Sequence, residues 1–204
     1  MTERLLAQLD DAIDHWRQTD PLLVALAEEH RPDPALSSGD DPFAALVESI
    51  THQQVSLAAG RTIHGRALEA MGGVASPAAA LAAGPEALRG AGLSRSKVAY
   101  VLDLAERCDN GSLDLAALEA ASDDEVIAAL TAVKGIGVWT AKMFLLFHLQ
   151  RPDVSAPEDL GVRVAAAIAY GMPEADGAAL VKEKAAVWSP YNSLACLVLW
   201  HSRR

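Results

Sequence analysis

Apolar side chains recur along this chain at the spacing of an α-helix. Two series follow the three- and four-residue steps that place side chains on one helix face: Leu5, Leu9, Ile13 and Trp16, then Phe43, Leu46, Val47 and Ile50. No stretch shows the strict alternation of apolar and polar residues that is typical of a half-buried strand. The pattern predicts an all-α fold in which these stripes form the core faces of the helices.

Capping residues and glycines mark where the helices begin and end. Three dipeptides place a capping side chain immediately before a proline suited to a first helical turn: Asp20-Pro21, Asp41-Pro42 and Ser76-Pro77. Ser122 and Glu125 have the spacing of a capping box. Two pairs are typical of helix C-termini: Gly72-Gly73 and Asn110-Gly111. Prolines and glycines interrupt the Ala-rich stretch 75–91, so we expect short helices and turns there.

Composition limits the functions open to this chain of 204 residues. The formal net charge of −10 argues against binding nucleic acid through a generally basic surface, so any DNA contact must be local. Cys108 and Cys196 are too few for a disulfide framework or an iron-sulfur cluster, and we expect both to be buried thiols. We find no signal peptide and no segment long enough to span a bilayer, which predicts a cytoplasmic protein without a membrane partner.

The stretch from Leu130 to Ala141 predicts a turn that can bind a phosphate. One helix ends and another begins across Gly135 and Gly137, with the apolar Ile136 between them. Glycine permits a tight turn and close approach, and the amides that begin the second helix carry the positive end of its dipole. Ile136 would anchor the turn in the core, and Lys134 would add charge without a base-specific contact. A simple helix-helix turn explains the glycines alone equally well.

Longer segments favour the phosphate-binding interpretation. The stretch LTAVKGIGVWTAKMFLLFHLQRPDV, followed by SAPEDLGVR, resembles the hairpin and catalytic segment of the helix-hairpin-helix (HhH-GPD) DNA glycosylase superfamily. DPFAALVESITHQQVSLAAGRTI resembles that family's early helix and Gln-Gln segment, and WSPYNSLACLVLW resembles its closing helix. These segments cover most of residues 41–200, and they resemble most the bacterial 3-methyladenine DNA glycosylase II group, in a compact form.

The resemblance implies two helical subdomains with an active-site cleft between them, across which DNA lies. Residues 1–38 and 156–204 are expected to form one subdomain, and residues 39–155 the other, with the helix-hairpin-helix at about 126–149. The implied activity is hydrolysis of the N-glycosidic bond of alkylated bases, such as 3-methyladenine and 7-methylguanine, in duplex DNA. The enzyme is expected to be a monomer that acts in base excision repair.

The resemblance places the catalytic carboxylate at Asp159. Positive charge builds on the deoxyribose as the base departs, and a fixed anion beside C1′ stabilises it and orients or deprotonates the attacking water. Helix capping is the structural alternative for Asp159, and the adjacent Glu158 is interpreted as a solvent-facing or N-terminal helix residue. Relatives with lyase activity carry a lysine at the position of Trp139, and neither Lys134 nor Lys142 matches it, so no lyase activity is expected.

Aromatic residues are expected to hold the base once it has left the helix stack. The indole faces of Trp139 and Trp200 suit a purine made cationic by alkylation, and both match pocket positions of the resembling branch. Tyr191 is expected to support the pocket, and Met143 stands where relatives have an aromatic residue. Asn192 stands where an arginine is expected. These two departures leave the lesion range open.

Contacts with DNA are expected at the hairpin, the Gln-Gln segment and nearby basic residues. Gln54 is the first candidate to fill the gap left by the extruded base, although a helix cap or a buried hydrogen-bonding glutamine is an equal alternative. The full set of candidate DNA contacts is Gln53, Gln54, Arg61, Arg95, Lys97, Lys134, Gly135, Gly137 and Thr140. The resemblance also implies a monovalent cation, Na⁺ or K⁺, on the backbone carbonyls of Thr131, Val133 and Ile136, with no other cofactor required.

Two other functions stay open on the sequence alone. A non-catalytic relative would recognise distorted DNA through the same hairpin, and only the formation of abasic sites distinguishes it from an enzyme. A helical protein-interaction scaffold fits the acidic composition but not the hairpin, and salt-dependent duplex binding separates it from the other two. Pocket shape decides between N3-methyladenine, N7-methylguanine, alkylated pyrimidines, ethenoadenine and deaminated purines, and the sequence does not specify that shape.

Overall fold

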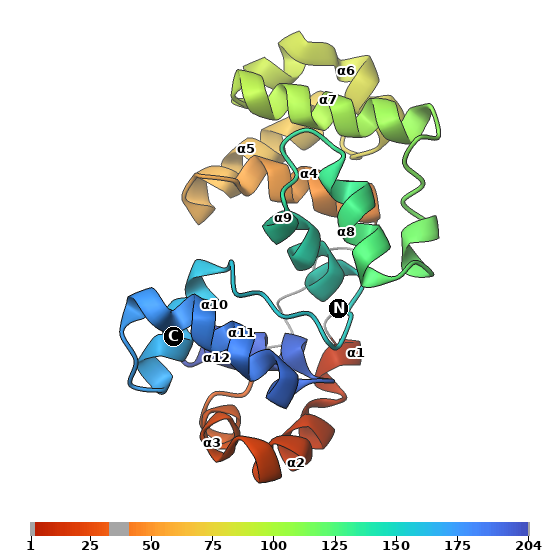
Figure 1. The fold of residues 1–204 in the computed structure, drawn as a ribbon. Coiled ribbons are helices and arrows are strands. Elements are labelled where there is room, and N and C mark those ends of the chain that lie inside the picture. The colour runs from red at the N-terminus through yellow and green to blue at the C-terminus, as the bar shows by residue number, and fades with distance from the viewer. Residues whose placement is uncertain (1–2, 33–40, 204) are drawn as a thin grey trace. The chain divides into compact units, whose positions relative to one another are not determined.

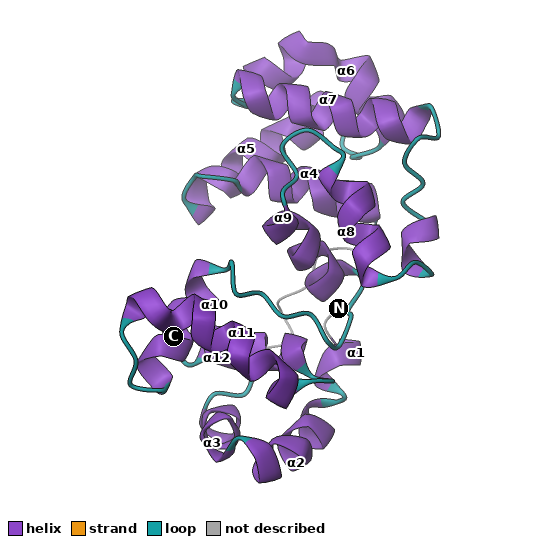
Figure 2. Cartoon of the chain, viewed as in Figure 1, coloured by secondary structure: helices purple, strands orange, loops and turns teal. Residues whose placement is uncertain are grey.

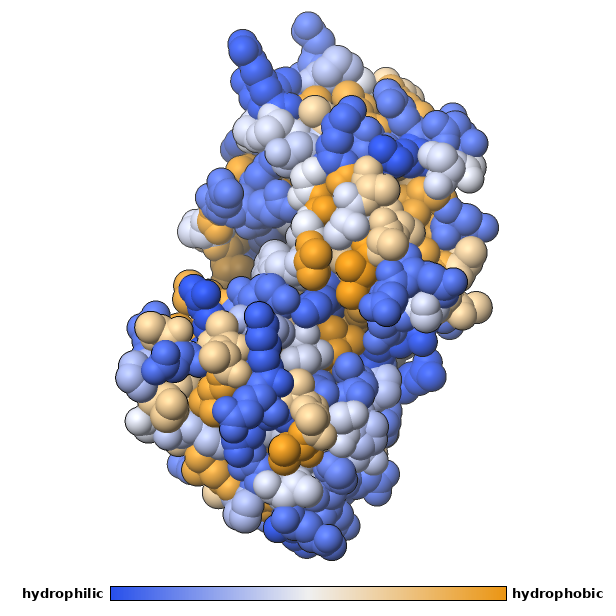
Figure 3. Space-filling model, viewed as in Figure 1, coloured by the Kyte–Doolittle hydropathy of each residue, from blue (hydrophilic) through white to orange (hydrophobic). Residues whose placement is uncertain are grey.

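The computed structural model describes residues 3–32 and 41–203, and within these residues it contains helices and loops but no strand (Figure 2). The predicted all-α fold is confirmed. None of the described helices is both long enough and apolar enough to cross a bilayer. On the face drawn in Figure 3, polar residues predominate and apolar residues form small separate groups.

The chain divides into two compact units, each with its own core. Unit 1 combines Met1–Ser38 with Leu145–Arg204, and unit 2 is Gly39–Phe144 (Figure 1). The first boundary lies where the sequence predicts it, but the second lies before residue 145 and not after residue 155. The reason is that α12 (Asn192–His201) binds the segment after the hairpin: the Ser193 hydroxyl donates to the Arg151 carbonyl at 2.6 Å and accepts from the Val154 amide at 3.0 Å.

Unit 1 is built from helices at both ends of the sequence. Its elements are α1 (Glu3–Leu6), α2 (Leu9–Thr19), α3 (Pro21–Glu29), most of the π-helical turn η2 (Phe144–His148), α10 (Leu160–Ala169), the short 3-10 helix η3 (Glu174–Asp176), α11 (Gly177–Trp188) and α12. The early helices pack on the late ones, α2 on α11 and α3 on α12. Trp16 and Trp188 are completely buried in this core, in agreement with the predicted apolar stripe of α2.

Asp20 joins the two chain segments of unit 1. As the predicted N-cap of α3, it accepts a hydrogen bond from the Leu23 amide at 3.3 Å. Its other carboxylate oxygen accepts from the Tyr170 hydroxyl at 2.6 Å and from the Trp188 indole at 3.0 Å, and it lies 3.1 Å from the Lys184 ammonium. Burial raises the pKa of Asp20, but the hydrogen bonds from these four donors together lower it by more. The pKa of Asp20 therefore lies below its ordinary value.

Unit 2 contains the helices of the central part of the chain. They are α4 (Pro42–His52), α5 (Leu57–Ala70), α6 (Pro77–Gly90), α7 (Arg95–Asp109), the short 3-10 helix η1 (Ala117–Glu119), α8 (Asp123–Thr131) and α9 (Val138–Met143). The core includes the predicted stripe of α4 together with buried leucines from α6, α7 and α8: Leu88, Leu104 and Leu130. Figure 1 shows α6 and α7 side by side at one end of this unit.

The predicted helix boundaries of unit 2 are confirmed. The Asp41, Ser76 and Ser94 side chains each cap a helix, and Ser122 and Glu125 form the reciprocal capping box. The glycines after α5 and α7 adopt positive φ angles. The Ala-rich stretch is two short helices joined at Gly84, as the sequence predicts, because φ there is 69°.

The two cysteines differ in burial. Cys196 is fully buried on α12, as expected, whereas Cys108 on α7 is only half-buried, so the prediction for Cys108 is wrong. Cys108 lies in the last turn of α7, where the helix meets solvent. Burial and the negative charge of Asp114 raise the pKa of the Cys108 thiol to about 11, so the residue is a thiol near neutral pH.

Candidate functional site

The turn between α8 and α9 has the geometry that its two glycines predict. Gly135 adopts a φ of 77°, and Gly137 is the N-cap of α9. Between them, the Ile136 side chain is 4% exposed and lies in the core of unit 2, so the predicted apolar anchor is confirmed. The Ile136 amide donates to the carbonyl of Val133 at 3.2 Å, which closes the turn.

Two side chains outside the hairpin hold Gly135 in place. A Cβ atom at Gly135 would lie 2.1 Å from the ring of Tyr100 on α7, so the ring occupies the space that a larger residue would need. The Gln53 side-chain amide donates to the Gly135 carbonyl at 3.0 Å. Gln53 therefore braces the hairpin, and its contact with DNA stays a prediction.

Replacing Gly135 with alanine is expected to lower the free energy of unfolding by about 2–4 kcal/mol, because it combines positive-φ strain with a clash against Tyr100. Chemical denaturation in urea measures the loss. Gly137→Ala is the matched control, since an added Cβ at Gly137 meets no atom within 4 Å and its φ is −95°. Equal losses in the two variants would show that the Tyr100 contact does not constrain the turn.

Asp103 on α7 fixes the lysine of the hairpin. Its carboxylate accepts the Lys134 amide at 2.9 Å and the Arg107 Nε at 2.9 Å, and it pairs with the Lys134 ammonium at 3.1 Å. Burial raises the pKa of Asp103, but the hydrogen bonds from Lys134 and Arg107 lower it more. Asp103 could not be predicted from the sequence, because its partner lies 31 residues away and leaves no local pattern. The Lys134 charge is thus already paired within the protein.

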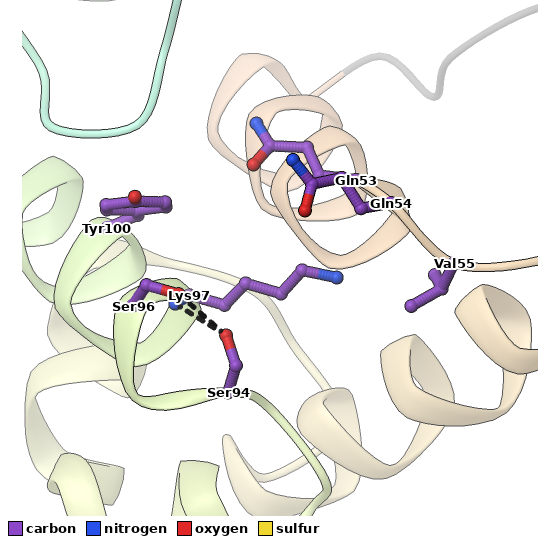
Figure 4. A pocket seen from close by; sticks show the side chains of 7 residues that line it. All are labelled: Gln53, Gln54, Val55, Ser94, Ser96, Lys97 and Tyr100. Atoms are coloured by element: carbon purple, nitrogen blue, oxygen red, sulfur yellow. Dashed lines mark hydrogen bonds between the residues drawn. The ribbon is translucent and has the colours of Figure 1, made fainter.

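A pocket lies beside Gln53, the residue that braces the hairpin, and its neighbour Gln54 (Figure 4). It has a volume of about 240 Å³ and is lined by Gln53, Gln54, Val55, Ser94, Ser96, Lys97 and Tyr100. Lys97 points into it, and its ammonium donates to the Thr51 carbonyl at 2.8 Å. Burial lowers the pKa of Lys97 from its ordinary value. Gln54 is exposed at the rim, in a left-handed conformation with φ of 55°.

The remaining DNA-contact candidates of unit 2 differ in accessibility. Arg61 on α5 and Arg95 at the start of α7 are exposed, as a phosphate contact requires. The side chain of Thr140 is only 4% exposed, because it faces the core in the first turn of α9, so the predicted DNA contact would involve its backbone amide. Trp139 is 40% exposed and Met143 is buried, so only the tryptophan presents a face to solvent.

The predicted acid, Asp159, lies in unit 1 as the N-cap of α10. Its Oδ1 accepts the Val162 amide at 2.8 Å and the Trp200 Nε1 at 2.8 Å, and the residue is 8% exposed. The capping interpretation is therefore confirmed, and the catalytic role stays a prediction that is compatible with it. Glu158, the neighbouring carboxylate, is exposed, as expected for a solvent-facing residue.

The indole of Trp200, which donates to Asp159, packs against another aromatic ring. The ring of Trp200 stacks on Phe147, with centroids 5.4 Å apart and an interplanar angle of 17°. Phe147 could not be predicted from the sequence, because nothing local to the π-helical turn η2 indicates its partner on α12. Gly161 leaves space for this arrangement, since a Cβ there would lie 2.7 Å from Trp200 Nε1.

Tyr191 and Asn192 lie at the start of α12, away from Trp200 in its last turn. Tyr191 precedes the first turn and packs edge-on against His15 at 5.8 Å, about 13 Å along the helix axis from Trp200 in the last turn. Asn192 is 4% exposed and donates to Asp153 at 2.5 Å and to the Ala185 carbonyl at 3.0 Å. Tyr191 is therefore not part of the Trp200 surroundings, and Asn192 anchors the loop that precedes Asp159.

The hairpin carbonyls suit a monovalent cation better than a transition metal. No group of His, Cys, Asp and Glu side chains in the described part of the chain is arranged to hold a metal ion. The carbonyls of Thr131, Val133 and Ile136 are neutral oxygen donors around one turn. The Val133 carbonyl already accepts one amide, and its second lone pair is the one that a cation would use. Neutral carbonyl oxygens of this kind favour Na⁺ or K⁺ over a transition metal, and the cation itself stays a prediction.

Comparisons with known proteins show which family has this fold and hairpin. The model of the family described as HhH-GPD superfamily base excision DNA repair protein matches residues 47–190. The crystal structure of a DNA-3-methyladenine glycosidase from Bacillus halodurans matches with a TM-score of 0.82 and 39% identity, over 91% of this chain and 85% of that one. The 3-methyladenine DNA glycosylase of Schizosaccharomyces pombe, solved in complex with abasic DNA, matches with a TM-score of 0.78 and 26% identity, over 93% and 95%.

A sequence relative gives the same result over almost the full chain. A Bacillus subtilis protein named putative DNA-3-methyladenine glycosylase is 28% identical over 201 residues, which are 95% of this chain and 69% of that protein. The family match covers the Gln-Gln segment, the hairpin and the segment that carries Asp159. The chain belongs to the HhH-GPD superfamily of base excision DNA repair proteins.

Proposed function

We propose that this protein is a monofunctional DNA glycosylase that hydrolyses the N-glycosidic bond of alkylated bases, such as 3-methyladenine and 7-methylguanine, in duplex DNA. The observation that carries the proposal is the carboxylate of Asp159, which is nearly buried and held by two hydrogen-bond donors beside an indole ring. Relatives named DNA-3-methyladenine glycosylase support the substrate class.

Asp159 supplies the negative charge that the reaction needs. As the base leaves, positive charge develops at C1′ of the deoxyribose, and a fixed carboxylate stabilises it at no cost of reorganisation. The same carboxylate orients the attacking water and accepts its proton. The two hydrogen bonds to Oδ1 hold the carboxylate in place before DNA binds.

The aromatic residues bind the extruded base. A base alkylated on a ring nitrogen is often cationic and is attracted to the electron-rich face of an indole. Trp200 is in direct contact with Asp159, and Trp139 on α9 is 40% exposed. Each of the two tryptophans is assigned a base-binding role, and Tyr191 is left out, since it lies near the other end of α12 from Trp200.

Unit 2 provides the contacts with the DNA backbone. The backbone amides between Gly135 and Thr140 begin α9 and would bind one phosphate. Carbonyls of Thr131, Val133 and Ile136 would hold a Na⁺ or K⁺ ion, whose charge adds to this phosphate site. Lys97 and the exposed Arg61 and Arg95 would meet further phosphates, and Gln54 at the rim of the pocket would fill the gap in the stack.

We propose that the enzyme acts as a monomer of the 3-methyladenine DNA glycosylase II type without lyase activity. Lyase chemistry needs an amine that attacks C1′, and the chain has Trp139 where relatives with that activity have lysine. The ammonium of the nearby Lys134 is paired with Asp103, which argues further against Lys134 as the attacking amine.

The test uses duplex DNA methylated with dimethyl sulfate, beside an unmethylated duplex of the same sequence. We expect release of free 3-methyladenine and 7-methylguanine, and strand breaks only after alkali treatment, because alkali cleaves the abasic sites that remain. Breaks without alkali that borohydride traps as a covalent complex would contradict the monofunctional proposal. Salt-dependent binding without base release would instead identify a non-catalytic DNA-binding relative.

A further inference from the structure

The indole of Trp200 has two partners in unit 1 that constrain it in different directions. Its Nε1 donates to Asp159 Oδ1 at 2.8 Å, which directs the edge of the ring at the carboxylate. Its face stacks on Phe147, with ring centroids 5.4 Å apart and planes inclined by 17°. The first contact defines where the ring points, and the second defines its plane.

Two hydrogen-bond donors on Oδ1 contribute to the orientation of the Asp159 carboxylate. The terminal torsion of an aspartate side chain is soft, so the carboxylate plane is not determined by the backbone. The Val162 amide comes from the helix that Asp159 caps and supplies one direction. The Trp200 Nε1–H supplies a second direction. Two donors on Oδ1 together define where Oδ2 of the same carboxylate lies.

Gly161 makes this arrangement possible. A Cβ at position 161 would lie 2.7 Å from Trp200 Nε1, 2.8 Å from its Cδ1 and 3.1 Å from Asp159 Oδ1. No L-residue with a side chain fits there unless the indole moves away from the carboxylate. The absence of a side chain at Gly161 is therefore a requirement of the Trp200–Asp159 hydrogen bond.

We propose that Phe147 and Trp200 are positioning residues for Asp159: Phe147 sets the plane of the indole, and the indole N–H sets the plane of the catalytic carboxylate. The inference rests on the proposed function of Asp159. It adds a second role for Trp200, because the ring that binds the base also orients the acid. Phe147 covers one face of this ring, so the base stacks on the opposite face.

The consequence is that these residues act on the rate of bond cleavage more than on DNA binding. Trp200→Phe keeps an aromatic face but removes the N–H donor, so we expect single-turnover release of 3-methyladenine from methylated duplex to slow by about 10- to 100-fold. Binding to a duplex with a tetrahydrofuran abasic-site analogue should change by less than about 3-fold. Phe147→Leu should slow release by about 3- to 10-fold, and Phe147→Tyr, which keeps the stack, should restore it.

The geometry itself is tested by Gly161→Ala and by nuclear magnetic resonance. Gly161→Ala removes no functional group, so we expect it to slow release at least as much as Trp200→Phe. Gly65→Ala on α5 is the matched control, because an added Cβ there meets nothing within 4 Å. The Trp200 Nε1–H resonance, assigned by its loss in Trp200→Phe, should move in Asp159→Asn and in Phe147→Leu.

The outcomes separate this inference from the proposed function. Loss of release in Asp159→Asn together with wild-type rates in Trp200→Phe and Phe147→Leu would overturn the positioning role and leave the proposed function standing. Equal losses of binding and rate in Trp200→Phe would also overturn it, since the ring would then serve only as a surface for the base. Full activity of Asp159→Asn would refute the proposed catalytic role itself. Thermal unfolding of each variant identifies any loss of activity that comes from misfolding. If Trp200→Phe does not fold, Phe147→Leu, at a half-buried position, tests the inference instead.

Discussion

Replacing Asp159 with asparagine is expected to lower the rate of base release at least about 1,000-fold, because it removes the charge that stabilises the developing cation on the sugar. Asparagine is also a good N-cap, and its carbonyl oxygen accepts the same hydrogen bonds from Val162 and Trp200. The substitution therefore removes charge without removing the local structure. Single-turnover release of methylated bases measures the effect, and thermal unfolding should change by only a few degrees.

Glu158→Gln is the matched control for this prediction. It neutralises a carboxylate one residue away, on an exposed side chain, and should leave the rate within about 3-fold of wild type. An active Asp159→Asn protein combined with an inactive Glu158→Gln protein would move the catalytic role to Glu158. The pair of variants thus decides which of two adjacent acids does the chemistry.

The second large effect is expected from Asp20→Ala, which should lower the free energy of unfolding by about 3–5 kcal/mol at neutral pH. Asp20 is 3% exposed, and its removal leaves the Tyr170 hydroxyl, the Trp188 indole and the Lys184 ammonium without their acceptor. Unfolding in urea measures the change. The surface pair of Asp14 and Arg17 gives the control, because Asp14→Ala removes an exposed ion pair at 3.1 Å and should cost less than about 1 kcal/mol.

The contribution of Asp20 to the free energy of unfolding also depends on pH, in a direction that its pKa predicts. Its pKa in the folded protein lies below the ordinary value of 3.8, so the folded state binds its proton less readily than the unfolded state does. The stabilisation is complete above that ordinary value and declines as the pH falls toward the folded-state pKa. We therefore expect the difference between wild type and Asp20→Ala to be constant from pH 7 to about 5 and to shrink below about pH 4. A difference that grows with acidity would contradict the assigned network.

Features encoded within a few residues were predictable from the sequence. The caps at Asp20 and Ser122 and the turn at Gly135 depend on local backbone chemistry, and the structure has all of them. The hairpin anchor Ile136 follows from its place between two glycines in an apolar surrounding. Resemblance to a family supplied Asp159, which composition and spacing alone would have left as a helix cap.

Features made by contacts between distant residues were not predictable. Asp103 binds Lys134 across 31 residues, Gln53 binds Gly135 across 82, and Trp200 binds Asp159 across 41. Such pairs leave no periodic signal, because each residue type is ordinary in its own helix. The same reason explains the second unit boundary, which depends on the hydrogen bonds of Ser193 to Arg151 and Val154.

The order of the units along the chain has a consequence for synthesis on the ribosome. Unit 2 is continuous, so all of its helices have been made when residue 144 leaves the exit tunnel, and it can fold then as a domain. The helices before residue 33 must wait for partners that are translated last, because α2 packs on α11 and α3 on α12. Nascent chains halted after residue 144 has left the exit tunnel, but before α11 and α12 have emerged, should therefore protect α4 to α9 from protease while leaving α2 and α3 open to cleavage.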